Sequence, residues 1–260
     1  MKLSIIIPCY NEVDNVPKLY EELLPVIRAM LASGKMNSTE SLDSAEMIFV
    51  DDGSSDDTSI RLKERFSAAT SSGLSFQFLK HETNAGLGAA VRTGFTHANG
   101  DILVTVDSDG TYKFSEIPAL LNCLLPGVDI VTASPYHPQG GVVGVPEYRL
   151  FFSKGSSMLY RILVDRNIYT YTCLFRAYRV KVVQEISFLS NDFLGGTELL
   201  VKAMLKGFRA ADFPSVLHRR VYGVSKARIA RTIHSHLKFM GWVLLQRLHL
   251  IFRTRADATV

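Results

Sequence analysis

The sequence predicts an α/β protein in which residues 1–135 form an open, mostly parallel sheet. Short apolar runs alternate along this half with segments of helical pattern, and acidic residues gather directly after two of the runs. A continuous apolar run of about four to eight residues is typical of a parallel strand buried on both faces. The chain has 260 residues, of which 47% are hydrophobic and 21% charged. That composition excludes a disordered or fibrous protein and allows a sizeable core.

Each element of this half follows from a local pattern. Strands are predicted at the apolar runs 3–7, 47–50, 74–79, 102–106 and 129–132. Helices are predicted at 14–33, 56–70, 85–98 and from 115 onward. Pro17 suits the first turn of the first helix, where its missing N–H costs nothing, and Asn99-Gly100 is a typical helix end.

Residues 136–226 have a less regular pattern. A loop rich in Gly and Pro comes first, and the later elements are a helix at 147–164, a β-like run at 169–178, a helix at 197–206 and an extended segment at 216–222. We expect one domain over 1–226, with a nucleotide-binding half at 1–135 and an acceptor half at 136–226. Residues 227–260 are expected to form a C-terminal helix and tail.

The C-terminal segment is basic and amphipathic. From Ala227 one helix is predicted to continue to Phe252, because apolar residues recur at helical spacing. Residues 215–260 hold nine Lys and Arg residues against one acid, which indicates an anionic partner. Such a helix suits either a membrane interface or packing on the body or on a partner chain. Nucleic acid is not predicted as a partner, because no aromatic and basic platform accompanies the charge.

The cysteine content and the hydropathy of the sequence indicate where in the cell the protein is expected. Three cysteines without metal-ligand spacing favour reduced thiols and a cytoplasmic protein. No secretory signal is recognised, and no apolar stretch reaches the roughly 18–20 residues of a spanning helix. We therefore expect a peripheral protein on the cytoplasmic face of a membrane, which it would reach through the basic tail or through an integral membrane partner.

The central chemical feature is Asp107-Ser108-Asp109, at the end of the fourth predicted strand. Asp51-Asp52 follows the second strand in the same way. In open α/β sheets, ligands bind at the carboxyl ends of the strands. Two carboxylates one residue apart can meet a single hard cation, and diphosphate oxygens and water can complete its octahedron. Asp107 and Asp109 therefore predict an Mg²⁺ or Mn²⁺ site.

Five motifs occur together in a fixed order. They are Ser4 to Glu12, Val50 to Thr58, Asn84-Ala85-Gly86 with Arg92 and Gly94, Asp107-Ser108-Asp109, and Arg220 to Lys226. Together they resemble the family 2 inverting glycosyltransferases with the GT-A fold, and most of all the dolichol-phosphate mannose synthase and polyprenyl-phosphate glycosyltransferase branch. The resemblance implies a Rossmann-like GT-A mixed sheet flanked by helices. It also implies metal-dependent transfer of a sugar from a nucleotide-diphosphate sugar to a polyprenyl phosphate.

The resemblance also implies roles for individual residues. The nucleotide pocket would use Pro8, Tyr10, Asn11, Glu12, Asp52, Asn84, Gly86, Arg92 and Asp107. Asp107 and Asp109 would act in catalysis and hold the metal. Arg220, Ser225 and Lys226 would close over the diphosphate, and Arg149 and Arg176 would hold the acceptor phosphate. UDP and GDP donors both remain open, because Asp52 could pair with uracil or with guanine.

The acceptor class is also open. A lipid monophosphate is already anionic and needs only cations to place it, whereas a sugar hydroxyl needs a carboxylate base. Asp192 and Glu198 are the candidate catalytic bases. The alternatives are a hydroxyl acceptor, such as a glycan, glycolipid or small molecule, and a non-catalytic nucleotide-sugar-binding protein. A nucleotidyltransferase or a dinucleotide dehydrogenase is disfavoured, because neither glycine-rich phosphate fingerprint is complete.

Overall fold

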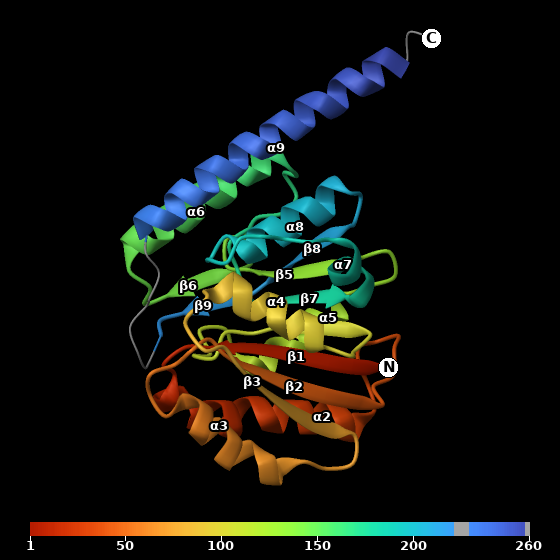
Figure 1. Cartoon of the computed structure of the whole chain (residues 1–260). Coiled ribbons are helices and arrows are strands. Elements are labelled where there is room, and N and C mark those ends of the chain that lie inside the picture. Colours follow the sequence, from red (N-terminus) through yellow and green to blue (C-terminus); the bar gives the residue numbers. More distant parts are fainter. Residues whose placement is uncertain (221–228, 258–260) are drawn as a thin grey trace.

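The computed structural model describes residues 1–220 and 229–257, and Figure 1 shows a central sheet with helices on both faces. Seven strands form the sheet in the order β3-β2-β1-β4-β7-β5-β8. They are β1 (Lys2–Cys9), β2 (Ser44–Asp51), β3 (Leu74–Lys80), β4 (Ile102–Thr105), β5 (Ile130–Ser134), β7 (Arg176–Arg179) and β8 (Ala210–Pro214). Neighbouring strands are parallel, except that β7 runs antiparallel to both β4 and β5. A separate ribbon pairs β6 (Gly141–Val143) with β9 (Val216–His218).

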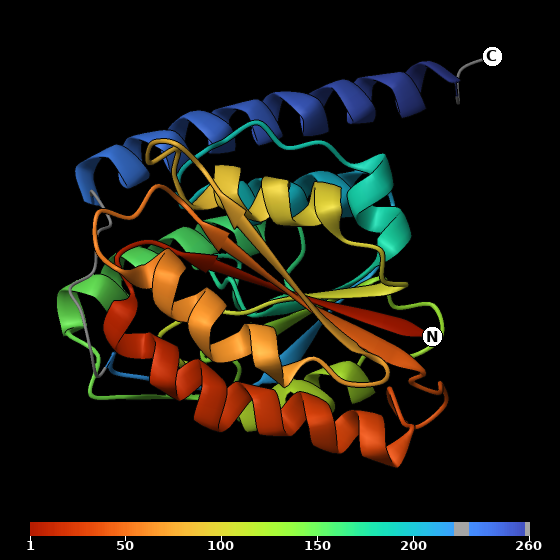
Figure 2. The same cartoon turned by 60° about the horizontal axis from the view of Figure 1, so that its bottom comes forward.

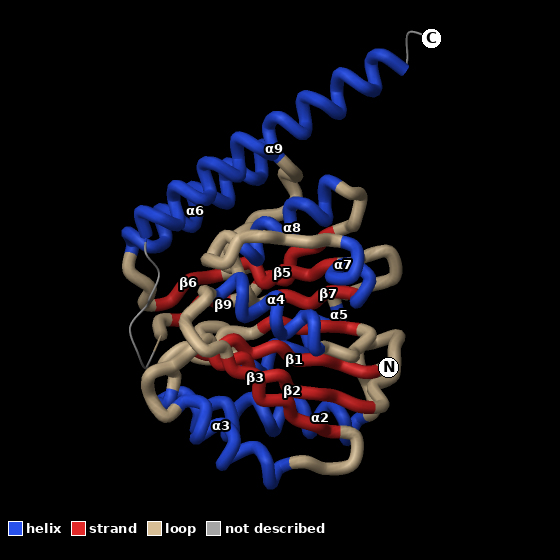
Figure 3. Tube along the Cα trace, in the orientation of Figure 1, coloured by secondary structure: helices blue, strands red, loops and turns tan. Residues whose placement is uncertain are grey.

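The helices lie in layers on the sheet. They are α1 (Val16–Lys18), α2 (Leu24–Ser33), α3 (Thr58–Phe66), α4 (Leu87–His97), α5 (Ile117–Asn122), α6 (Glu147–Leu163), α7 (Val180–Glu185), α8 (Gly195–Leu205) and α9 (Ile229–Asp257). Helices α2, α3 and α5 cover one face, and α4 and α8 cover the other (Figure 2). Helices α6 and α9 lie side by side beyond α8, as Figure 3 also shows.

Apolar clusters on both faces of the sheet hold these layers together. Alternate residues of β1, such as Leu3 and Ile5, pack with Phe49 and Phe66 toward α2 and α3. On the other face, Ile6 approaches Gly94 so closely that a Cβ on this α4 glycine would lie 2.4 Å from the isoleucine side chain. Small residues of α4 therefore let the helix sit directly on the sheet. This close packing brings the N-terminal end of α4 to the edge where the parallel strands end.

The predicted α/β class, the five strands of the first half and the C-terminal helix are confirmed. The predicted strand at 169–178 is wrong over its first seven residues, because only 176–179 form a strand. The N–H of Tyr169 donates to the Asp212 carboxylate (2.6 Å), and that of Tyr171 donates to the Ser157 hydroxyl (3.1 Å). These backbone groups are thus satisfied by side chains, and no neighbouring strand is needed. The sequence analysis also missed β8 and α7, which are short.

Helix α9 buries one side and exposes apolar residues on another. Phe239, Met240 and Val243 are buried against the body, whereas Leu237 and Leu245 are more than half exposed. Figure 1 shows that its C-terminal end projects beyond the body. None of the described helices is both long and apolar enough to cross a membrane.

The contact between α6 and α9 buries a histidine. His236 of α9 is 5% exposed, and its Nδ1 lies 3.1 Å from the hydroxyl of Tyr160 on α6. Burial lowers the pKa of His236 from 6.5 to about 4, although the Asp192 carboxylate acts in the opposite direction. The folded protein therefore keeps this imidazole neutral in mildly acidic solution.

We expect acid to destabilise this contact. Between pH 6.5 and about 4 the unfolded chain binds a proton at His236 that the folded chain does not bind. The neutral, buried imidazole of His236 therefore contributes its full stabilisation above pH 6.5. The free energy of unfolding falls progressively as the pH decreases from 6.5 to about 4. Replacing His236 by Gln should reduce the loss of unfolding free energy between pH 7 and 4.5 by about 2–3 kcal/mol. Urea unfolding at the two pH values measures this, and the exposed His234→Gln on the same helix is the control. Equal pH dependence in wild type and His236→Gln would contradict the prediction.

Candidate active site

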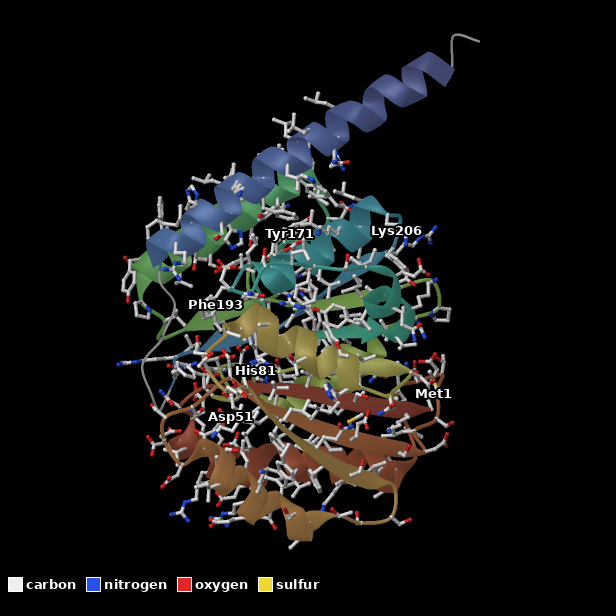
Figure 4. All side chains as sticks on the ribbon, in the orientation of Figure 1. Met1, Asp51, His81, Tyr171, Phe193 and Lys206 are labelled. Carbon is white, nitrogen blue, oxygen red and sulfur yellow. The ribbon has the colours of Figure 1, made fainter. Side chains whose placement is uncertain are left out.

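A cavity of about 860 Å³ opens where β1, β2 and β4 end. Figure 4 shows Asp51, His81 and Phe193 on this side of the molecule, opposite Met1. The sequence-predicted residues that line the cavity are Pro8, Tyr10, Glu12, Asp52, Asn84, Gly86, Asp107, Asp192 and Arg220. Parallel strands bring these distant positions together because their carboxyl ends share one edge. The structure thus gathers residues from both halves of the chain around one space.

Asp52 organises one wall of this cavity. One carboxylate oxygen accepts from the N–H of Ala85 (2.9 Å) and contacts the His81 ring nitrogen (2.7 Å). The other accepts from the Asn84 amide (2.9 Å) and the N–H of Gly86 (2.8 Å). Asp52 is 3% exposed, and these four contacts use both of its oxygens. In this structure it positions the turn that precedes α4, and contact with a nucleotide base stays a prediction.

Arg220, which lines the cavity, pairs with two carboxylates, those of Asp109 and Glu12. The Nε of Arg220 donates to Asp109 Oδ2 (2.5 Å), and its Nη1 lies 3.3 Å from Glu12 Oε1. The other Asp109 oxygen accepts from the N–H of Thr111 (2.9 Å). Asp109 is nearly fully buried, and these partners compensate for the loss of water around its carboxylate. The ion pair ties the segment after β9 to the end of β4.

Asp107 differs from Asp109 because its carboxylate makes no hydrogen bond or ion pair with any described residue. Burial, and next the Asp109 carboxylate, raise the pKa of Asp107 to about 7. A divalent cation at this point would stabilise both carboxylates, so the pair fits the predicted metal. Within residues 1–220 and 229–257, there is no group of three or more His, Cys, Asp or Glu side chains that could by itself hold a metal ion. The remaining ligands would therefore come from substrate and water.

The two candidate bases are both engaged in the fold. Asp192 lines the cavity, but one oxygen accepts from the N–H of Leu194 (3.0 Å) and the other from the hydroxyl of Ser235 on α9 (2.8 Å). Glu198 lies outside the cavity lining, pairs with Lys202, and accepts from the N–H of Ser190 (2.8 Å). Burial acts to raise the pKa of Glu198, but these partners outweigh it and lower the pKa. Both carboxylates thus hold the 189–194 segment in place.

The predicted acceptor residue Arg176 does not line the cavity. Arg176 is fully buried in β7 and donates to the hydroxyl of Thr132 (3.0 Å) and to the carbonyl oxygens of Gly196 (2.5 Å) and Tyr171 (2.6 Å). Its guanidinium therefore organises the segments around it. Arg149 belongs to α6, and its side chain lies outside the described part of the structure, as do Ser225 and Lys226.

Two residues predicted to bind the nucleotide, Asn11 and Arg92, are not among those that line the cavity. Asn11 accepts from the N–H of Ser55 (2.8 Å), and its own N–H donates to the hydroxyl of Ser54 (2.8 Å). Arg92 donates to the carbonyl of Phe188 (3.3 Å) and to the Asn191 side chain (2.5 Å). Both residues position loops that reach the cavity, and any direct contact with nucleotide stays a prediction.

The sequence analysis missed part of the site. Ser190, Asn191 and Phe193 line the cavity, as do three residues of α9, namely Arg231, Thr232 and Ser235. A signal for the second group was present in the sequence, because polar residues at 231, 232 and 235 share one face of a helix. A side pocket of about 200 Å³ adjoins the cavity through Asp107, Leu174 and Phe193, and hydroxyl groups such as those of Thr111 and Thr172 line it.

Comparison with known proteins agrees with this arrangement. The chain is 29% identical over 250 residues to polyprenol monophosphomannose synthase of Mycolicibacterium smegmatis, covering 94% of this chain and 88% of that protein. It is 30% identical to dolichol-phosphate mannosyltransferase of Pyrococcus furiosus, covering 92% of this chain but only 62% of the relative.

Solved structures support the fold. Glucosyl-3-phosphoglycerate synthase from Mycobacterium tuberculosis, crystallised with Mg²⁺ and UDP, superposes with a TM-score of 0.64 at 18% identity, covering 92% of this chain and 79% of that one. At this identity the likeness concerns the fold alone, and it confirms the predicted GT-A architecture. The model of the family described as glycosyl transferase family 2 matches residues 4–187. The chain therefore belongs to glycosyl transferase family 2 and is a glycosyltransferase.

Proposed function

We propose that this glycosyltransferase moves a sugar from a UDP- or GDP-linked donor to a polyprenyl phosphate at the cytoplasmic face of a membrane. The observation that carries the choice of acceptor is the engagement of Asp192 and Glu198. A hydroxyl acceptor needs a carboxylate base, and both candidate bases are already bonded within the fold, whereas a phosphate acceptor is already anionic and needs none. The names of the two relatives, a polyprenol monophosphomannose synthase and a dolichol-phosphate mannosyltransferase, support the same acceptor class.

Each wall of the cavity has a part in the proposed reaction. The turn held by Asp52, together with Pro8 and Tyr10, would receive the nucleoside. Asp107 and Asp109 would hold Mg²⁺ or Mn²⁺, which would neutralise the diphosphate as it leaves. Arg220 would exchange part of its pairing with Glu12 and Asp109 for the diphosphate oxygens, and Ser225 and Lys226 are proposed to join it. The acceptor phosphate oxygen would then attack the sugar carbon from the side opposite the diphosphate.

The proposed membrane contact rests on α6 and α9. Large apolar side chains are exposed on both helices, including Phe151 (74% exposed) and Met158 on α6 and Leu245 on α9. Contiguous exposed apolar surface is costly in water and typical of an interaction site. We propose that this two-helix surface lies in the bilayer interface. The three cysteines form no disulfide, which supports the reducing cytoplasmic side.

Transfer assays with two acceptors test the proposal. With a UDP-linked or a GDP-linked sugar as donor, the wild-type protein should form a lipid-linked sugar. It should do so both with a long-chain polyprenyl phosphate in vesicles and with a short-chain polyprenyl phosphate in solution. Phe151→Asp should lower transfer in vesicles about tenfold, because it removes one large apolar side chain from the proposed bilayer contact, and leave transfer to the soluble acceptor unchanged.

Ile60→Asp is the matched control, since Ile60 is an exposed apolar residue of α3 in the opposite helix layer. It should not affect either reaction. Transfer only to hydroxyl acceptors, with loss of that activity in Asp192→Asn, would contradict the proposal and favour a base-catalysed enzyme.

A further inference from the structure

We infer that Arg231 of α9 is the cation that binds the anionic head of the acceptor. The inference rests on the proposed function. It adds to it the residue that binds the acceptor phosphate and the helix, α9, along which the acceptor would reach the cavity. It is carried by three observations: the position of Arg231 in the cavity wall, the charges around it, and the character of the helix that bears it.

The first turns of α9 form part of the cavity wall. Arg231, Thr232 and Ser235 all line the cavity. The hydroxyl of Ser235 donates to Asp192 Oδ2 (2.8 Å), which fixes this part of the helix against the 190–193 segment. Residues four apart lie on the same helix face, so the bond at Ser235 directs Arg231 toward the cavity as well.

Among the charged residues that line the cavity, Arg231 is available to bind an anion. Its described lining contains four carboxylates, those of Glu12, Asp52, Asp107 and Asp192, and two arginines. Arg220 is already paired with Glu12 and Asp109. Arg231 makes no hydrogen bond or ion pair with any residue in the described ranges, and it is exposed. An unpaired guanidinium in a cavity is suited to bind a phosphate bidentately.

The helix itself indicates which phosphate this is. The donor diphosphate is expected at the Asp107 and Asp109 wall, beside Arg220. Beyond the cavity, α9 exposes the apolar side chains of Leu237, Leu244, Leu245 and Leu248. One helix thus presents a cation at the cavity and apolar groups along its length, which matches a molecule with a phosphate head and an apolar tail. A phosphate monoester carries about 1.5–2 negative charges at pH 7, enough to pair with Arg231.

Kinetics with a short-chain, water-soluble polyprenyl phosphate test the inference without involving the membrane. Arg231→Gln should raise the KM for this acceptor about tenfold or more, and leave the KM for the donor within about twofold. Arg231→Lys should recover part of the affinity, because it restores the charge but not the fork of donors. Lys238→Gln removes a charge from the same helix outside the cavity lining and should change neither KM. An unchanged acceptor KM, or an equal rise in donor KM, would overturn the inference.

Calorimetry separates this inference from the proposed function. In the presence of nucleotide and Mg²⁺, wild type should bind the short-chain polyprenyl phosphate and Arg231→Gln should bind it about tenfold more weakly. This difference supports the role of Arg231 even if no sugar is transferred, an outcome that would instead overturn the proposed reaction. Inorganic phosphate is the second probe. Equal affinity of wild type for both probes would overturn the assignment to a lipid head, since the apolar tail would then contribute nothing.

Discussion

Asp109→Asn should reduce sugar transfer by at least about 100-fold and abolish metal-dependent binding of UDP or GDP. The substitution keeps the size of the side chain but removes a buried charge that pairs with Arg220 and that lies beside Asp107. A neutral amide cannot share a divalent cation with Asp107 at the same affinity. The diphosphate would then leave without the charge that neutralises it, and Arg220 would lose its ion pair with Asp109.

Calorimetric titration of UDP and GDP, with and without Mn²⁺, measures this effect directly, and transfer assays measure the rate. Asp57→Asn is the control, because Asp57 is an exposed acid in the loop after β2. Removal of metal from wild type by a chelator should match the effect of Asp109→Asn on the rate, and added Mg²⁺ or Mn²⁺ should restore it. Full activity of the chelated wild type would refute the role of the carboxylate pair as metal ligands.

The second large effect is expected at Gly88, where α4 meets the 190–192 segment. A Cβ at this position would lie 2.2 Å from the carbonyl oxygen of Ser190 and 3.0 Å from that of Asp192. The same junction is held by the N–H of Gly88, which donates to the Asn191 carbonyl (2.8 Å). Because the opposing atoms belong to the backbone, no side chain can move aside. Gly88→Ala should therefore cost about 3 kcal/mol of stability and displace Asp192 from the cavity wall.

Gly155→Ala is a matched control for this change. Both glycines lie in helices, where alanine is intrinsically preferred by about 1 kcal/mol, but a Cβ at Gly155 has no atom within 4 Å. Urea unfolding should show Gly155→Ala as stable as wild type or slightly more stable, and Gly88→Ala much less stable. Sugar transfer should be retained in the first and lost in the second. A Gly88→Ala protein with an unchanged unfolding midpoint would disprove the close contact.

The sequence predicted the parallel half of the fold well, because buried strands such as 3–7 and 102–106 are continuous apolar runs with few alternatives. It did not predict that β7 inserts between β4 and β5, since short-range pattern contains nothing about strand order or direction. Arg176 illustrates the difficulty. An arginine in a strand suggests exposure or ligand binding, yet hydrogen bonds to the oxygen atoms of Thr132, Tyr171 and Gly196 allow it to be fully buried.

In the candidate site, too, the sequence predicted which residues come together but not which contacts they make. Residues that directly follow the strands, such as Asp52 and Asp107, were predicted because topology alone brings them to one edge. The structural role of each residue depends on long-range contacts that the sequence does not reveal. Asp52 supports a turn 32 to 34 residues later, and Asp192 is bonded to α9. The place of Arg231 in the cavity wall likewise depends on how α9 packs on the body, which the net charge of the C-terminal segment does not reveal.

The position of β7 in the sheet has a consequence for how the chain can be made. Within the described structure β5 has only β7 and β8 as neighbouring strands, and β4 has β1 and β7. A nascent chain that has emerged only to residue 135 therefore has an open edge at β4 and no partner for β5. Strands β3, β2, β1 and β4 can pair before then, whereas β5 can join the sheet only after residues 176–179 have emerged. One sheet thus contains strands from both halves of the sequence, and a chain that ended near residue 135 would leave the edge of β4 unpaired and open to aggregation.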